Sequence, residues 1–200
     1  DVQITSDATG WQREQTGGSV YLRLTTNPLD QPTRTISPDL ASDIIAGGYW
    51  WREPGPNCEL IIAYQGVVAE QALAAAGQLA GQFSGQFSGQ SRDIGVLAVT
   101  SADRLNAGWT AAQQARTDGH KNAASHIEKL LENVPRHALM LTVIDGHPAT
   151  LSWLGGVKGM ATISHGVEHF GQTGTIGDLY RHFRLDTASL VEAVLNNSAR

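Results

Sequence analysis

The sequence predicts a three-layer α/β/α domain with a mostly parallel five-stranded sheet that includes one antiparallel strand. The first observation is that residues 58–64 form a nearly continuous apolar run, which is typical of a strand buried on both faces of a sheet. After Gln65-Gly66, apolar residues take the spacing of one helix face: Val68, Ala72, Ala75 and Leu79. Buried strands joined by helices imply a parallel sheet covered on both faces, because right-handed crossovers force that layering.

The same unit of strand and helix recurs along the chain. Residues 94–99 form a second buried strand, and a helix is expected over about 102–116. A third strand, residues 138–144, ends at the turn Asp145-Gly146-His147-Pro148, and residues 162–169 are a fourth candidate. Together with a strand upstream, they make up the five predicted strands.

Local sequence patterns predict the upstream strand and the starts of two helices. Residues 49–52 read as a strand, and the short turn to Cys58 predicts antiparallel pairing, with Trp50 and Trp51 facing opposite ways. Spacings of three between a hydroxyl and a carboxylate, in Ser125-His-Ile-Glu128 and Thr175-Ile-Gly-Asp178, predict the starts of two helices.

Residues 1–38 are predicted to be the remnant of a preceding domain, and residues 39–200 the α/β domain. Residues 19–26 alternate as a half-buried strand does, yet no neighbouring strand follows before a proline-rich linker over 27–38. The first residue is Asp and not Met, which suggests a piece of a longer chain. The tandem Gly-Gln-Phe-Ser repeat within 81–90 predicts a flexible surface loop.

Composition narrows the class of protein. Of 200 residues, 41% are hydrophobic and 16% charged, which is globular composition, and the net charge of -5 without a basic cluster argues against a nucleic-acid partner. No apolar run reaches the roughly 20 residues that span a bilayer, so no membrane partner is expected. The single cysteine, Cys58, excludes an intramolecular disulfide framework and favours a cytoplasmic location.

Polar residues follow three of the predicted parallel strands, where open parallel sheets bind ligands. The candidate crevice residues are Gln65, Gly66, Thr100, Ser101, Asp145 and His147. Ordinary turn chemistry explains Asp-Gly equally well.

A second candidate is an anion-binding turn at Gly171, Gly174 and Thr175, because backbone N–H groups point outward at a helix N-terminus. A turn with an N-cap needs the same residues and is the favoured alternative. His165 and His169 would share one strand face, but a metal needs a third ligand, so no metal site is predicted. The sequence contains no nucleophile elbow, phosphate-binding loop or paired cysteines, and no catalytic residue is predicted.

Two segments near the end of the chain resemble a known family. Gly166-Val-Glu-His-Phe-Gly-Gln-Thr-Gly174, followed by Leu179-Tyr-Arg-His-Phe-Arg-Leu-Asp186, is similar to the end of the transketolase-type C-terminal domain. The pair most resembles that of the homodimeric pyruvate dehydrogenase E1 component. Residues 19–26 are similar to the last strand of that family's pyrimidine-binding domain, and Val99-Thr-Ser101 matches the ending of the family's second strand.

The resemblance implies that the parent protein is a homodimeric thiamine diphosphate enzyme. Such an enzyme decarboxylates a 2-oxo acid and passes the acyl unit to a lipoyl group on the E2 core. In the family, the sites for the diphosphate, Mg²⁺ and the pyrimidine lie in the other two domains, so this chain is expected to bind no cofactor itself. The implied role is dimerisation and support of the active-site cleft. The alternatives are the same section of a transketolase or deoxyxylulose-phosphate synthase, or a free-standing module that binds a small ligand.

Overall fold

A computed structural model of the chain describes residue 29 and residues 33–82, 93–169 and 171–197. The chain divides into two compact units, residues 1–35 and 36–200, and nearly all described residues lie in the second. The strand predicted over 19–26 and most of the Gly-Gln-Phe-Ser repeat lie outside the described residues. The remnant interpretation of residues 1–38 therefore stays a prediction.

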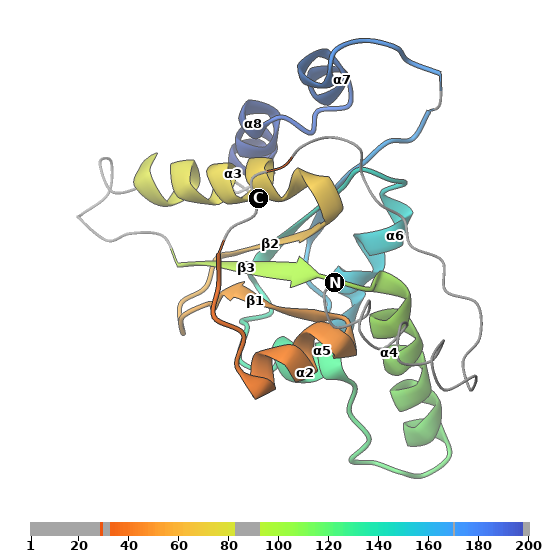
Figure 1. The fold of residues 1–200 in the computed structure, drawn as a ribbon. Coiled ribbons are helices and arrows are strands. Elements are labelled where there is room, and N and C mark those ends of the chain that lie inside the picture. Colours follow the sequence, from red (N-terminus) through yellow and green to blue (C-terminus); the bar gives the residue numbers. More distant parts are fainter. Residues whose placement is uncertain (1–28, 30–32, 83–92, 170, 198–200) are drawn as a thin grey trace. The chain divides into compact units, whose positions relative to one another are not determined.

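The second unit is built on a five-stranded sheet with the order β1-β3-β2-β4-β5 (Figure 1). The strands are β1 (Gly48–Arg52), β2 (Leu60–Gln65), β3 (Ile94–Val99), β4 (Leu139–Ile144) and β5 (Thr162–His165). Strands β2 to β5 run parallel to one another, and β1 is antiparallel to β3. The predicted fold class is confirmed.

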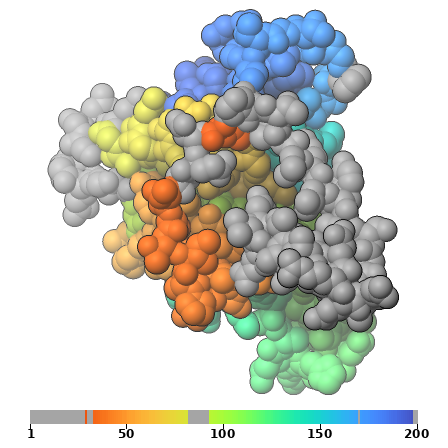
Figure 2. Space-filling model, in the orientation of Figure 1, coloured from red at the N-terminus to blue at the C-terminus, as the bar shows by residue number. Residues whose placement is uncertain are grey.

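Helices cover both faces of this sheet (Figure 1). They are α2 (Pro38–Ala46), η1 (Gly66–Val68), α3 (Ala69–Gln82), α4 (Ala102–Thr117), α5 (His126–Leu130), α6 (Ala149–Ser152), η2 (Trp153–Val157), α7 (Ile176–His182) and α8 (Thr187–Asn197). One apolar cluster joins the sheet to α3 and α8, and a second joins the other face to α4, α5 and α6. In the space-filling view, α3 in yellow lies beside the C-terminal segments in blue (Figure 2).

Two sequence-based expectations about the strands are wrong in detail. The antiparallel neighbour of β1 is β3 and not the following strand β2, because β2 is already paired on both sides by β3 and β4. Strand β5 ends at His165 instead of continuing to His169. At Gly166 the chain presses against the turn after β4, where an added Cβ would lie 2.5 Å from the Gly146 carbonyl oxygen. The two histidines therefore do not share a strand face.

Helix α2 was not anticipated from the sequence. Its start uses the Ser37 hydroxyl, which accepts from the Leu40 N–H at 3.2 Å, and Pro38 occupies the first turn, where a missing N–H costs nothing. The expected linker therefore ends before Pro38. A signal was present, because Leu40, Ala41, Ile44 and Ile45 share one helix face, although none of them is fully buried.

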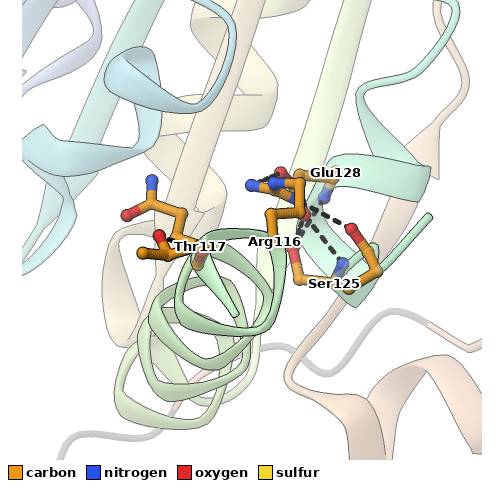
Figure 3. Close-up of polar contacts among 6 residues, drawn as sticks. Arg116, Thr117, Ser125 and Glu128 are labelled. Atoms are coloured by element: carbon orange, nitrogen blue, oxygen red, sulfur yellow. Dashed lines mark hydrogen bonds and ion pairs between the residues drawn. The ribbon is translucent and has the colours of Figure 1, made fainter. Parts of the chain in front are cut away.

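The junction between α4 and α5 is held by Arg116, Ser125 and Glu128 (Figure 3). Arg116 donates to the Glu128 carboxylate at 2.8 Å, and the Ser125 N–H and hydroxyl donate to its other oxygen at 2.8 and 2.7 Å. This confirms the predicted capping box. Burial alone would raise the pKa of Glu128, but the hydrogen bonds from Arg116 and Ser125 outweigh it, so its pKa lies below the ordinary value.

We expect Glu128→Gln to lower the free energy of unfolding at pH 7 by about 1–2 kcal/mol, because charge-assisted hydrogen bonds become neutral ones. The pKa of Glu128 is lower in the folded state, so the carboxylate's contribution is complete above its unfolded pKa of about 4.3 and is lost as the pH falls through the folded pKa. Urea unfolding from pH 7 to pH 3 measures both effects. The control is the exposed Glu132→Gln. Equal stability of the two variants at pH 7 would contradict the assignment.

Candidate functional site

The carboxyl ends of β2, β3 and β4 lie at one edge of the sheet, because these strands are parallel. Gly66 follows β2 with a φ of 79°, a left-handed conformation that glycine adopts without strain. A Cβ on Gly66 would lie 3.1 Å from an oxygen of the Asp145 carboxylate, which follows β4. The structure thus brings Gly66 and Asp145 together, as the crevice prediction requires.

Thr100 and Ser101, after β3, hold the turn between α2 and β1. Their two N–H groups both donate to the Gly47 carbonyl at 3.0 Å, and the Thr100 hydroxyl donates to the Ile44 carbonyl at 2.6 Å. The Ser101 hydroxyl accepts from the Arg104 N–H at 3.3 Å and caps α4. Both side chains are engaged in these local contacts.

The two remaining candidate crevice residues are Gln65 and His147. The side-chain oxygen of Gln65 is buried and has no hydrogen-bond partner among the described residues. His147 is exposed, and its Nδ1 accepts from the Ala149 N–H at 3.2 Å at the start of α6. Neither residue lines the cavity beside Asp145.

A cavity of about 440 Å³ opens beside Asp145, between the turn after β4, residues 167–169 and 171–173, and α7. We call it the Asp145 cavity. Its polar lining is Asp145, His169, Gln172, Thr173 and Tyr180, and its apolar lining is Val167, Leu179, Phe183 and Leu185. Gly171 lines it too, so the cavity joins one residue from the predicted crevice with one from the predicted anion turn.

The floor of the cavity is tied to the sheet. The Val167 N–H donates to the Gly146 carbonyl at 2.8 Å, which fixes the chain after β5 against the turn after β4. Gly166 lies where an added Cβ would come within 2.8 Å of Pro148. This close approach explains why the sequence has glycine at the point where the chain leaves the sheet.

Two ionisable groups around the cavity have shifted pKa values. Burial raises the pKa of Tyr180, and the negative charges of Asp145 and Glu70 raise it further. Behind it on β5, burial lowers the pKa of His165 and the Arg184 guanidinium adds to that effect. Burial and the two nearby carboxylates therefore both favour the neutral phenol of Tyr180.

The predicted anion turn is engaged by the protein's own carboxylate. The Thr175 hydroxyl accepts from the Asp178 N–H at 3.2 Å and donates to the Asp178 carboxylate at 2.6 Å, so it caps α7. Gly174 faces the same residue, since a Cβ there would lie 3.5 Å from the Asp178 Cβ. Anion binding at Gly171, Gly174 and Thr175 stays a prediction.

Sequence reasoning missed the side chains of α7 that line the cavity, above all Tyr180. The available signal was the aromatic pair in Tyr180-Arg-His-Phe183, which packs partly against the core on the α3 face. Within the described ranges, no group of three or more His, Cys, Asp or Glu side chains is placed to hold a metal ion. None of the helices in the described part of the chain combines the length and apolar character that crossing a bilayer requires.

Comparison with known proteins gives a likeness of fold. No protein-family model and no curated protein sequence matches the chain. Among solved structures, transketolase from Campylobacter jejuni aligns with a TM-score of 0.53 at 17% identity, covering 78% of this chain and 19% of that one. Transketolase from Leishmania mexicana aligns with a TM-score of 0.54 at 16% identity over 80% of this chain and 19% of its own.

A third match is a split-gene transketolase, described as an inactive β4 tetramer, with a TM-score of 0.53 and 17% identity. The alignment covers 77% of this chain and 43% of that one. The chain therefore has a transketolase-like fold, and it spans about one fifth of the length of the Campylobacter and Leishmania transketolases.

We expect Gly66→Ala to lower the free energy of unfolding by about 1–3 kcal/mol, because alanine in the left-handed region is strained and its Cβ would crowd the Asp145 carboxylate. The matched control is Gly77→Ala, on an exposed helix position where an added Cβ meets nothing within 4 Å. That change should stabilise the protein by about 0.5–1 kcal/mol. Urea unfolding of both variants measures the two changes in the free energy of unfolding. If Gly66→Ala leaves that free energy unchanged, the proposed geometry of the turn is wrong.

Proposed function

We propose that this chain is the C-terminal, non-catalytic domain of a thiamine diphosphate-dependent enzyme of the transketolase type. The observation that carries the proposal is the alignment with transketolases over 77–80% of the chain at TM-scores of 0.53–0.54. The resemblance of residues 166–174 and 179–186 to the end of that domain type supports it independently. In this proposal the parent enzyme, and not this chain, holds thiamine diphosphate and Mg²⁺.

The finer proposal is that the parent resembles the pyruvate dehydrogenase E1 component, a cytoplasmic enzyme that delivers an acyl unit to a lipoyl-E2 partner. Its support is the quality of the match at Gly166–Gly174 and Leu179–Asp186. The alternative, a section of a transketolase or deoxyxylulose-phosphate synthase, fits the fold equally well, because a shared architecture does not determine the reaction.

The proposed role of this domain is to hold a homodimer together and to support the active-site cleft. The inactive β4 tetramer formed by the split-gene transketolase supports assembly by a related fold without catalysis. In this chain both tryptophans of β1 are half-buried. Trp50 packs on the α4 and α5 side and donates to the Leu130 carbonyl at 3.1 Å, whereas Trp51 packs on the α3 side. The large exposed apolar side chains are Ile36, Ile176 and Leu195 among the described residues.

The proposal predicts that the native polypeptide carries thiamine diphosphate although this chain does not. An antibody raised against the chain should isolate from its source cells a polypeptide that releases thiamine diphosphate on denaturation, measured by fluorescence after oxidation. The same sample should decarboxylate pyruvate if the finer proposal holds, and should transfer ketol groups between sugar phosphates if the alternative does.

The matched control for that experiment is the 200-residue chain itself. Calorimetry with thiamine diphosphate and Mg²⁺ should show no binding, because the chain contributes no diphosphate site in this proposal. A micromolar dissociation constant for the isolated chain would contradict its non-catalytic assignment. A native polypeptide without the cofactor would favour the free-standing module that binds a small ligand.

We also expect the chain to self-associate. Light scattering across concentration should give twice the monomer mass for the full chain, and also for a shortened chain that begins at Ile36, the first residue of the second compact unit. Ile176→Ser and Leu195→Ser test the exposed apolar positions, with Ala107→Ser on exposed α4 surface as the control. If both chains remain monomers at high micromolar concentration, the dimerisation role is wrong.

A further inference from the structure

The Asp145 cavity has the size and the position of a small-molecule site. Its volume of about 440 Å³ falls within the range of roughly 300–1,000 Å³ that small-ligand sites occupy. It lies at the carboxyl end of β4, the edge at which open parallel sheets bind ligands. None of the residues of α7, which forms one wall, is buried, so this wall borders solvent.

The charges around the cavity favour a cation. Asp145 is the one carboxylate among the described residues that line it, and no lysine or arginine is among them. Burial raises the pKa of Tyr180, and the negative charges of Asp145 and Glu70 raise it further, which agrees with an acidic surrounding of this wall. The two arginines in and after α7 each have a carboxylate partner: Arg184 contacts Glu192 at 3.2 Å and Arg181 contacts Asp178.

The remaining lining residues favour a ligand whose cationic group is attached to an apolar part. Leu179 comes from α7 and Phe183 from its C-cap, and Val167 and Leu185 come from the segments on either side of the helix. The ring of Tyr180 adds an aromatic face, which attracts cations as well as hydrocarbon. An ionised carboxylate accepts several hydrogen bonds, so Asp145 can bind an ammonium group in addition to its contacts within the chain.

We propose that the Asp145 cavity binds a small primary ammonium compound with an apolar body. The ammonium group donates to the Asp145 carboxylate, and the hydrocarbon packs against Leu179, Phe183 and the Tyr180 ring. Nothing in the reaction proposed for the parent enzyme requires this site, so the two proposals stand or fall separately.

Three probes of matched shape test the charge preference on the full chain: 2-phenylethylammonium, the neutral 2-phenylethanol and the anionic phenylacetate. Titration followed by ligand-observed NMR and calorimetry at pH 7 should show the ammonium compound binding about tenfold more tightly than the alcohol, because a charge-assisted hydrogen bond is roughly twice as strong as a neutral one. Phenylacetate should not bind. Absence of ammonium binding at millimolar concentration, or equal binding of all three probes, would overturn the proposal.

Two variants and a control assign the binding to this cavity. Asp145→Asn should weaken 2-phenylethylammonium about tenfold and leave 2-phenylethanol unchanged, whereas Leu179→Ala should weaken both. The control is Glu168→Gln, an exposed carboxylate on the same segment that does not line the cavity. Circular dichroism confirms that each variant is folded. Unchanged affinity in folded Asp145→Asn, or an equal loss in Glu168→Gln, would place any binding elsewhere.

Discussion

The central constraint on this structure is that β2 is enclosed on every side. Residues Leu60 to Tyr64 are all buried, and the strand pairs with β3 on one edge and β4 on the other. A strand with two apolar faces requires a helical layer on each, because each large apolar side chain is worth about 1.5–3 kcal/mol when buried. Helices α3 and α8 supply one layer, and α4, α5 and α6 supply the other.

The same constraint leaves the ends of the strands as the places where a binding site can form. The turn after β4 holds the segment after β5 through the hydrogen bond between Gly146 and Val167, which gives the Asp145 cavity a fixed floor. Its wall at α7 is held differently, since Tyr180 and Phe183 are only partly buried against the core. A rigid floor beside a lightly packed wall is typical of sites that bind ligands at the edge of a parallel sheet.

The parts that local patterns determine were predictable, and the parts that depend on distant contacts were not. The enclosed β2 strand and the Ser125 box follow from apolar runs and hydroxyl–carboxylate spacing, and both are confirmed. The partner of β1 depends on which edge of the sheet remains open, and the early end of β5 depends on the fit of Gly166 against Gly146. No residue near β1 indicates its partner, and the one signal near β5 is Gly166, which does not reveal what it packs against.

The candidate site divides in the same way. Strand ends predicted that Gly66 and Asp145 would lie close together, but Tyr180 lines a cavity with Asp145 only because α7 packs near a turn that is distant in sequence. The chain shares its fold with the Campylobacter transketolase, but at 17% identity most side chains differ between the two. The segment 166–186 carries the resemblance to that family, and it also supplies every described lining residue except Asp145. The ligand of the cavity must therefore be argued from the charge of Asp145 and its apolar neighbours, because a shared fold does not determine the chemistry.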